Sequence, residues 1–231
     1  SLAANGVIVV TTKSGRKSSR KGLEVQVNSS YSFEDIANVP DIQDVYAQGA
    51  AFDFNQGFVG TWGERYDVLN AQGGIPHPYD QAALNPIFPE YQGVIIPAVA
   101  TNNIEKFFKT GHVFENAVQI SSGNEFATIS AGASHMNNDG ISPNSSFKRT
   151  TVNFGGSAQL ANKLFVSGTI NYVSSDQQSV QLGTGLSATN TSILTRLMFT
   201  PPSMDLSKLP YINPFTNGSV YYRNDIDNPY W

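Results

Sequence analysis

The sequence predicts an all-β chain that forms part of a transmembrane antiparallel β-barrel. Five segments alternate apolar and polar residues, as strands with one apolar and one polar face do. Each runs for roughly 9 to 12 residues, which suits a tilted strand crossing a bilayer and exceeds the usual strand length of about 5 to 6. Long and short connections alternate between them, as the external loops and periplasmic turns of an outer-membrane barrel do.

Composition excludes several classes of protein. The chain has 231 residues, 14 Lys and Arg against 18 Asp and Glu, and no cysteine. Thiol nucleophiles, thiolate zinc sites and disulfide scaffolds are therefore excluded, and the mild acidity gives no reason to expect nucleic-acid binding. The longest apolar stretches, residues 6–10 and 93–100, are far shorter than the ~20 residues of a membrane-spanning helix.

The first 22 residues differ from the rest of the chain. Residues 7–12 are a β-branched run without polar alternation, which is typical of a strand buried on both faces. We expect residues 1–15 to end a small N-terminal domain, and the basic, Gly- and Ser-containing residues 16–22 to be a linker. No signal peptide opens the chain, so we expect it to be cut from a longer polypeptide.

The barrel segment is then predicted over residues 23–231, with about five strands of a larger barrel. The predicted strands cover residues 23–33, 114–122, 126–136, 149–160 and 163–174. Their apolar faces are predicted to contact lipid and include Val27, Val118, Val152 and Ile170. Their polar faces are predicted to line the lumen and include Gln26, Gln119 and Asn171. A soluble β-sandwich with one hydrated face gives the same alternation and remains the alternative.

The connections predict a topology. Short turns at residues 123–125 and 161–163 are expected on the periplasmic side. Long extracellular loops are expected at about residues 34–113, 137–148 and 176–231. Helix-like patterns at residues 40–47, 103–108 and 190–200 predict that these loops are folded.

Several short motifs, in order along the chain, resemble those of one family. Residues 3–15, Ala-Ala-Asn-Gly-Val-Ile-Val-Val-Thr-Thr-Lys-Ser-Gly, resemble the closing segment of the plug domain in the SusC/RagA family of TonB-linked outer-membrane transporters. Residues 107–111, 121–125, 138–141, 147–149 and 164–166 are similar to the second to fifth barrel strands of that family. Residues 1–33 and 104–175 carry most of the resemblance.

The resemblance implies a 22-stranded barrel that holds an N-terminal plug, in the outer membrane of a Gram-negative bacterium of the Bacteroidetes type. It also implies energy from TonB, through a region absent from this chain, and a SusD-like surface lipoprotein as partner. The implied function is import of a large polar nutrient, preferably an oligosaccharide. Peptide import by the same architecture, and a soluble β-sandwich adhesin or binding module, stay open as alternatives.

No residue constellation predicts an enzyme. His77, His112 and His135 lack the spacing of a metal site, and no phosphate loop or nucleophile elbow is present. We therefore expect no catalytic residue, cofactor or resident metal. Asp225 and Asp227 are close enough in sequence to join a calcium site built by several extracellular loops.

Aromatic residues in the long loops are the candidate contacts for substrate or partner. Such side chains stack on sugar rings or peptide side chains when exposed. The alternative for each is that it packs a core within the loops or meets the SusD-like partner. The candidates are Trp62, Tyr66, Tyr79, Tyr91, Tyr221, Tyr222 and Trp231.

Overall fold

The computed structural model describes residues 22–161, 164–180 and 192–231. The predicted plug strand, most of the predicted linker and part of the second predicted turn lie outside these residues. Contacts divide the described chain into two compact units. The strand unit contains residues 22–34, 111–140 and 145–178, and the loop unit contains residues 35–110, 141–144, 179–180 and 192–231.

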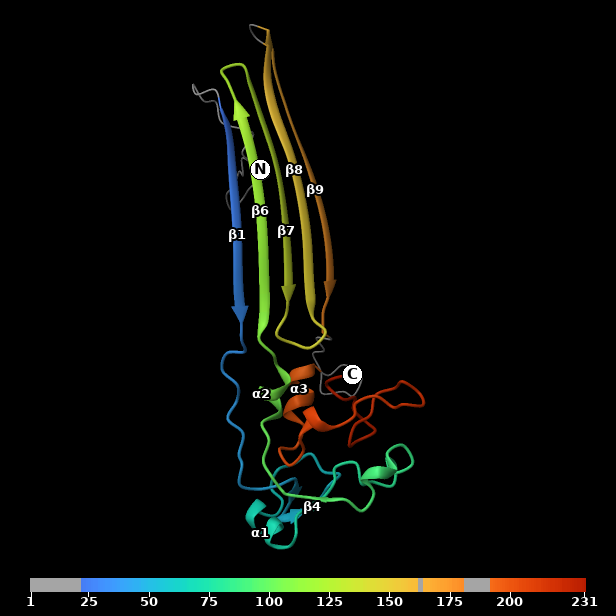
Figure 1. The fold of residues 1–231 in the computed structure, drawn as a ribbon. Helices are drawn as coiled ribbons and strands as arrows, with labels where there is room; N and C mark the ends of the chain where they lie inside the picture. The colour runs from blue at the N-terminus through green and yellow to red at the C-terminus, as the bar shows by residue number, and fades with distance from the viewer. Residues whose placement is uncertain (1–21, 162–163, 181–191) are drawn as a thin grey trace, which may run out of the picture. The chain divides into compact units, whose positions relative to one another are not determined.

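The strand unit is one antiparallel sheet of five long strands that lie side by side (Figure 1). Its strands are β1 (Leu23–Glu34), β6 (Gly111–Gly123), β7 (Ala127–Asp139), β8 (Ser146–Ala161) and β9 (Leu164–Gln178), in the order β1-β6-β7-β8-β9. All five predicted strands are confirmed, with lengths of 12 to 16 residues. The described sheet is open, with β1 and β9 at its two edges, so the described strands do not close a barrel by themselves.

Pairing register places residues of one kind opposite each other in rows across the sheet. One row joins Val27, Val118, Ala133, Val152 and Tyr172. The adjacent row joins Gln26, Gln119, Gly132, Asn153 and Asn171. Because directly paired residues share a face and neighbours along a strand alternate, the predicted apolar and polar faces are each continuous over all five strands. The pairing of β8 with β9 shifts between Gln159 and Ala161.

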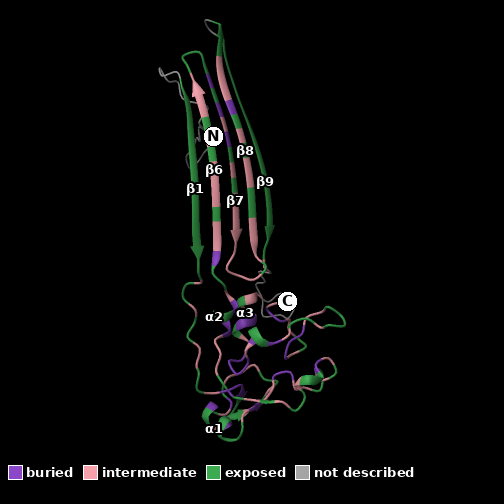
Figure 2. Cartoon of the chain, viewed as in Figure 1, coloured by how far each residue is buried: buried purple, intermediate pink, exposed green. Residues whose placement is uncertain are grey.

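The loop unit contains short elements only. These are β2 (Gly49–Ala50), β3 (Asp53–Phe54), α1 (Tyr66–Ala71), β4 (Ile75–Pro76), η1 (Pro89–Tyr91), β5 (Ile95–Ile96), α2 (Asn103–Phe107), α3 (Ile193–Met198) and η2 (Leu206–Lys208). No described helix is long and apolar enough to cross a membrane. Buried residues concentrate in this unit, whereas β1 and β9 are exposed throughout (Figure 2).

Two hydrophobic clusters stabilise the loop unit. The smaller contains Ala47, Tyr66, Leu69, Ile75 and Ala98. The larger joins the first long loop to the C-terminal residues. It contains Tyr79, Leu84, Phe88, Ile104, Phe107, Leu197, Met204, Leu206, Leu209, Val220, Tyr221 and Tyr222. The prediction that these loops are folded is therefore confirmed.

The helix predictions had mixed outcomes. Helix α2 lies within residues 103–108 and α3 within residues 190–200, and each begins at a side-chain cap, from Asn102 and Ser192 respectively. The helix predicted over residues 40–47 is wrong. The Gln43 side chain accepts hydrogen bonds from the Val45 and Tyr46 amides and donates to the Tyr46 carbonyl, so local bonds replace those of a helix.

Candidate functional site

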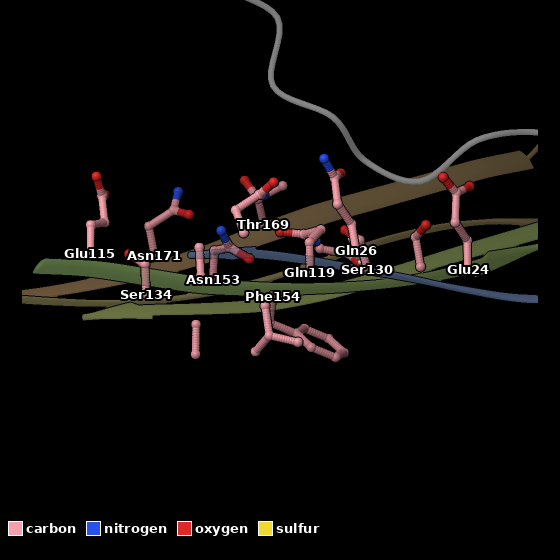
Figure 3. Close-up of a pocket in the computed structure, with 16 residues that line it drawn as sticks. Glu24, Gln26, Glu115, Gln119, Ser130, Ser134, Asn153, Phe154, Thr169 and Asn171 are labelled. Carbon is pink, nitrogen blue, oxygen red and sulfur yellow. Dashed lines mark hydrogen bonds between the residues drawn. The ribbon is translucent and has the colours of Figure 1, made fainter. Parts of the chain in front are cut away.

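The polar face of the sheet forms an open groove of about 820 Å³. All five strands contribute to its lining. Glu24, Gln26, Glu115 and Asn171 project from one side of the sheet, and the Phe154 ring projects from the other (Figure 3). The remaining polar groups of the groove are Asn28, Gln119, Ser121, Ser130, Ser134, Asn153 and Thr169.

Two glycines make room for the polar side chains in the middle of this face. A Cβ on Gly132 would overlap the Gln119 Oε1 and Asn153 Oδ1 atoms, because both amides lean over this glycine from the neighbouring strands. On Gly155, a Cβ would lie 3.2 Å from both Ser130 Oγ and Thr169 Cγ2. Close approach of side chains is thus a reason for glycine at both positions.

The chemistry of the groove is polar with little charge. Amides and hydroxyls both donate and accept hydrogen bonds, and Glu24 and Glu115 are the charged side chains of its lining. This set can hydrate a lumen or bind neutral polar groups such as sugar hydroxyls and peptide amides. It offers no nucleophile paired with a base, so the described groove has no catalytic arrangement.

The apolar face of the same sheet is exposed to its surroundings. Val27 and Ile170 are each 71% exposed. The other exposed apolar side chains on this face include Leu23, Val25, Val118, Ile120, Ile129, Val152, Phe154, Val166 and Tyr172. An exposed apolar surface of this extent marks a membrane or protein contact.

Aromatic rings gather on this face where β1 and β6 meet near the long loop. The Tyr31 ring lies 5.0 Å from Phe33 and 6.3 Å from Phe114, centroid to centroid. Its hydroxyl is hydrogen-bonded to His112 Nδ1 at 3.0 Å. Rings with a polar end are typical of the boundary between hydrocarbon and water.

Four of the seven aromatic contact candidates are buried in the loop unit, which corrects the prediction for them. Tyr79 is 0% exposed, and Tyr66, Tyr221 and Tyr222 are also buried. The hydroxyls of Tyr79, Tyr221 and Tyr222 are hydrogen-bonded within the loop unit; that of Tyr222, for example, donates to the Phe199 carbonyl at 3.1 Å. These tyrosines pack the cores of the loops, as the alternative interpretation proposed, and cannot contact a ligand in this structure.

Three candidates keep an accessible surface. Trp62 and Trp231 are each 61% exposed. Tyr91 is partly buried and stacks on His77, with ring centroids 3.9 Å apart. Their role as contacts stays a prediction.

The structure does not assemble the suggested calcium ligands. Asp225 accepts a hydrogen bond from Arg223 Nε at 2.8 Å, which lowers the pKa of this carboxyl. Asp227 lies 3.5 Å from the guanidinium of Arg196. Both carboxylates are thus paired with arginines, and no group of three potential metal ligands occurs among the described residues.

Sequence reasoning missed the glycines and several hydroxyls of the groove. Strand β7 has small residues at alternate positions, so its polar face gave a weak signal. Gly132 carries no side chain to mark a face, and only its pairing with Gln119 and Asn153 places it at the centre.

The fold is similar to that of a known transporter. It matches a chain of the RagAB peptide importer in the "closed-closed" state, with a TM-score of 0.62 and 18% sequence identity. The match covers 99% of this chain and 26% of that chain, so this chain spans about a quarter of its length. No protein-family model and no curated protein matches the sequence. The similarity to a SusC/RagA transporter is thereby confirmed for a fragment, whose antiparallel five-stranded sheet matches part of that barrel. The 22 strands and the plug domain stay expectations.

Proposed function

We propose that this chain is part of the wall of a TonB-dependent importer in the outer membrane, which takes up a large polar nutrient. One observation carries the proposal. Strands of 12 to 16 residues form a sheet with a continuous exposed apolar face and a continuous polar face. Such a sheet has stable surroundings where lipid covers one face and a hydrated lumen or plug covers the other.

The fold similarity supports this proposal over a soluble sandwich. A sandwich requires a second sheet over the apolar face, and no described element of the strand unit supplies one. We propose transport rather than catalysis, and a SusD-like surface lipoprotein as partner of the long loops. Trp62, Tyr91 and Trp231 are the proposed contacts of these loops with substrate or partner.

Two substrate classes are compatible with the polar groove. An oligosaccharide is the first candidate, because neutral amides and hydroxyls match sugar hydroxyls. A peptide is the second candidate, favoured by the similarity to a peptide importer.

Fractionation and uptake test the proposal in the full-length protein. We expect it in the outer-membrane fraction, extractable only with detergent and co-purifying with a lipoprotein. Cells that lack the gene should lose uptake of one nutrient class, and cells that lack TonB should lose it equally. Recovery in the soluble fraction without detergent would contradict the proposal. Labelled maltohexaose and labelled hexapeptides, supplied separately, distinguish the two substrates.

A further inference from the structure

Three aromatic side chains form an exposed cluster in the loop unit, which we call the aromatic triad. Phe52 and Trp62 are 63% and 61% exposed. The Tyr46 ring contacts both, with centroids 5.8 Å from Phe52 and 5.3 Å from Trp62. None of the three belongs to either hydrophobic cluster of the unit. Packing in the hydrophobic clusters of the loop unit therefore does not explain why these three rings gather at the surface.

The backbone that carries Phe52 is strained. Ala51 and Phe52 form the two-residue turn between β2 and β3, with φ angles of 53° and 62°. Turns with positive φ at both positions favour Asn and Gly, and a bulky side chain there costs free energy. Strain of this kind persists where the surrounding structure holds it, and it concentrates at binding sites. The turn thus holds Phe52 beside Tyr46 at a cost in stability.

Hydrogen bonds hold the backbone segments that carry the triad. The Phe52 amide donates to the Trp62 carbonyl at 3.0 Å, and the Trp62 amide donates to the Gly49 carbonyl at 3.2 Å. Gln43 Nε2 donates to the Tyr46 carbonyl at 2.7 Å and to the Thr61 carbonyl at 2.9 Å. All three ring-bearing backbones are therefore tied to one small network, so a ligand would meet a pre-organised surface.

The segment that carries the triad is acidic. Residues 41–67 contain five acidic residues and a single basic one, Arg65. Arg65 is itself paired with Asp67, with Nη2 and Oδ2 2.9 Å apart. Asp44 and Asp53, close to the triad in sequence, are exposed. Arg65 also lies beside the triad, because it pairs with Tyr46 in an isolated β-bridge, but Asp67 offsets its charge. The segment that carries the rings therefore has a net negative charge.

We propose that the aromatic triad binds an arginine or lysine side chain of a short basic peptide. Ring faces attract cations, and surrounding carboxylates add long-range attraction for a positive ligand. A neutral sugar would gain nothing from these carboxylates. Identification of this peptide as cargo rests on the proposed function, whereas the binding site itself does not.

Calorimetry on the purified full-length transporter tests the site. The probes are an octapeptide of alternating Arg and Gly, the same peptide with Glu in place of Arg, and maltohexaose. We expect binding of the Arg peptide only, weakened by added salt. Trp62→Ala should weaken it by about two- to fivefold, the size of an exposed cation–π contact. Phe215→Ala is the matched control, because Phe215 is 76% exposed and lies outside the triad.

A second variant separates binding from folding. Phe52→Gly removes a ring and relieves the positive-φ strain, so it should keep or raise thermal stability while it weakens peptide binding. Equal binding of the Arg and Glu peptides, or wild-type affinity in both Phe52→Gly and Trp62→Ala, would overturn the site. Uptake in cells is measured separately. If the nutrient is imported but the triad variants bind the Arg peptide like the wild type, this inference alone is rejected. If the nutrient is not imported but the triad variants bind the Arg peptide more weakly, only the proposed transport is rejected.

Discussion

The hydroxyl of Tyr79 donates a hydrogen bond to the carbonyl oxygen of Pro210 at 2.6 Å, across 131 residues of sequence. Asn103 makes a second link of this kind, because its side chain donates to the Met204 carbonyl at 2.7 Å and accepts from the Leu206 amide at 3.0 Å. Burial raises the pKa of Tyr79, so its hydroxyl stays a donor. The first long loop and the C-terminal residues therefore share one core.

We expect Tyr79→Phe to destabilise this core by about 1–2 kcal/mol, because the Pro210 carbonyl loses a buried donor. Tyr79→Ala should cost about 3–5 kcal/mol, because a cavity is added. Hydrogen exchange of the full-length protein measures both, with protection lost in residues 35–110 and 192–231 together. Loss confined to the segment around residue 79 would contradict a shared core.

The two faces of β6 should respond differently to charge. Val118→Lys places a cation on the face proposed to contact lipid and should cost about 2–4 kcal/mol of folding free energy in bilayers. Gln119→Lys, one residue away on the polar face, is the matched control and should cost little. Urea titration of folding into lipid vesicles measures the difference. A small cost for both variants would contradict lipid contact at Val118, and a large cost for both would contradict a hydrated environment at Gln119.

Two glycines should differ in their tolerance of alanine. At Gly132 a Cβ meets the ends of two flexible amide side chains, which can move, so Gly132→Ala should change stability by less than about 1 kcal/mol. At Gly63 it would lie 2.8 Å from the backbone carbonyl carbon of Gln48, so Gly63→Ala should cost about 1–3 kcal/mol. Thermal unfolding and local hydrogen exchange compare the two. A larger loss at Gly132 would refute this explanation.

Acid should weaken the loop core through Asp205. Burial is the largest single effect on this carboxyl and opposes its ionisation, but the hydrogen bonds from Lys106 and Ser207 and the charge of Lys106 together outweigh it and lower the pKa of Asp205 below the ordinary value. A lowered pKa adds stability above the ordinary Asp value, and this stability is lost as the pH falls toward the lowered one. Hydrogen exchange between about pH 6 and pH 3 measures the loss. Asp205→Asn should be less stable at pH 6 and less sensitive to acid.

Impermeant thiol labelling of intact cells checks the proposed topology. A cysteine at Asn144, in the loop between β7 and β8, should react from outside. A cysteine at Glu125, in the short turn between β6 and β7, should react only after the outer membrane is opened. Both variants retain the strands, so equal labelling would contradict the orientation.

Local sequence patterns predicted the sheet because each strand has its own alternation of apolar and polar residues. Val118 and Gln119 take opposite faces wherever β6 pairs, so their assignment needed no tertiary information. The loop core is different. Nothing near Tyr79 in sequence distinguishes a ring packed against Val220 from a ring exposed to ligand, because the deciding contacts are more than 100 residues away.

Short elements were missed for the same reason. Helix α1 has six residues and no side-chain cap, and its Tyr66 and Leu69 are placed by the smaller cluster rather than by helix propensity. At residues 40–47 the apolar spacing indicated a helix, yet Gln43 satisfies the backbone differently. Tertiary packing thus determines the loops, and periodicity determines the strands.

The aromatic residues at one end of the apolar face, which we call its aromatic edge, define the tilt of the strands from the membrane normal. On β9 that edge is Tyr172, whose row across the sheet ends at Val27 on β1. On β1 the aromatic edge lies further along, at Tyr31 and Phe33, an offset of about 13 to 20 Å at 3.3 Å per residue. Four interstrand spacings amount to about 19 Å. If lipid ends at this edge, the strands lean from the membrane normal by roughly 35 to 45°, the inclination of known outer-membrane barrels.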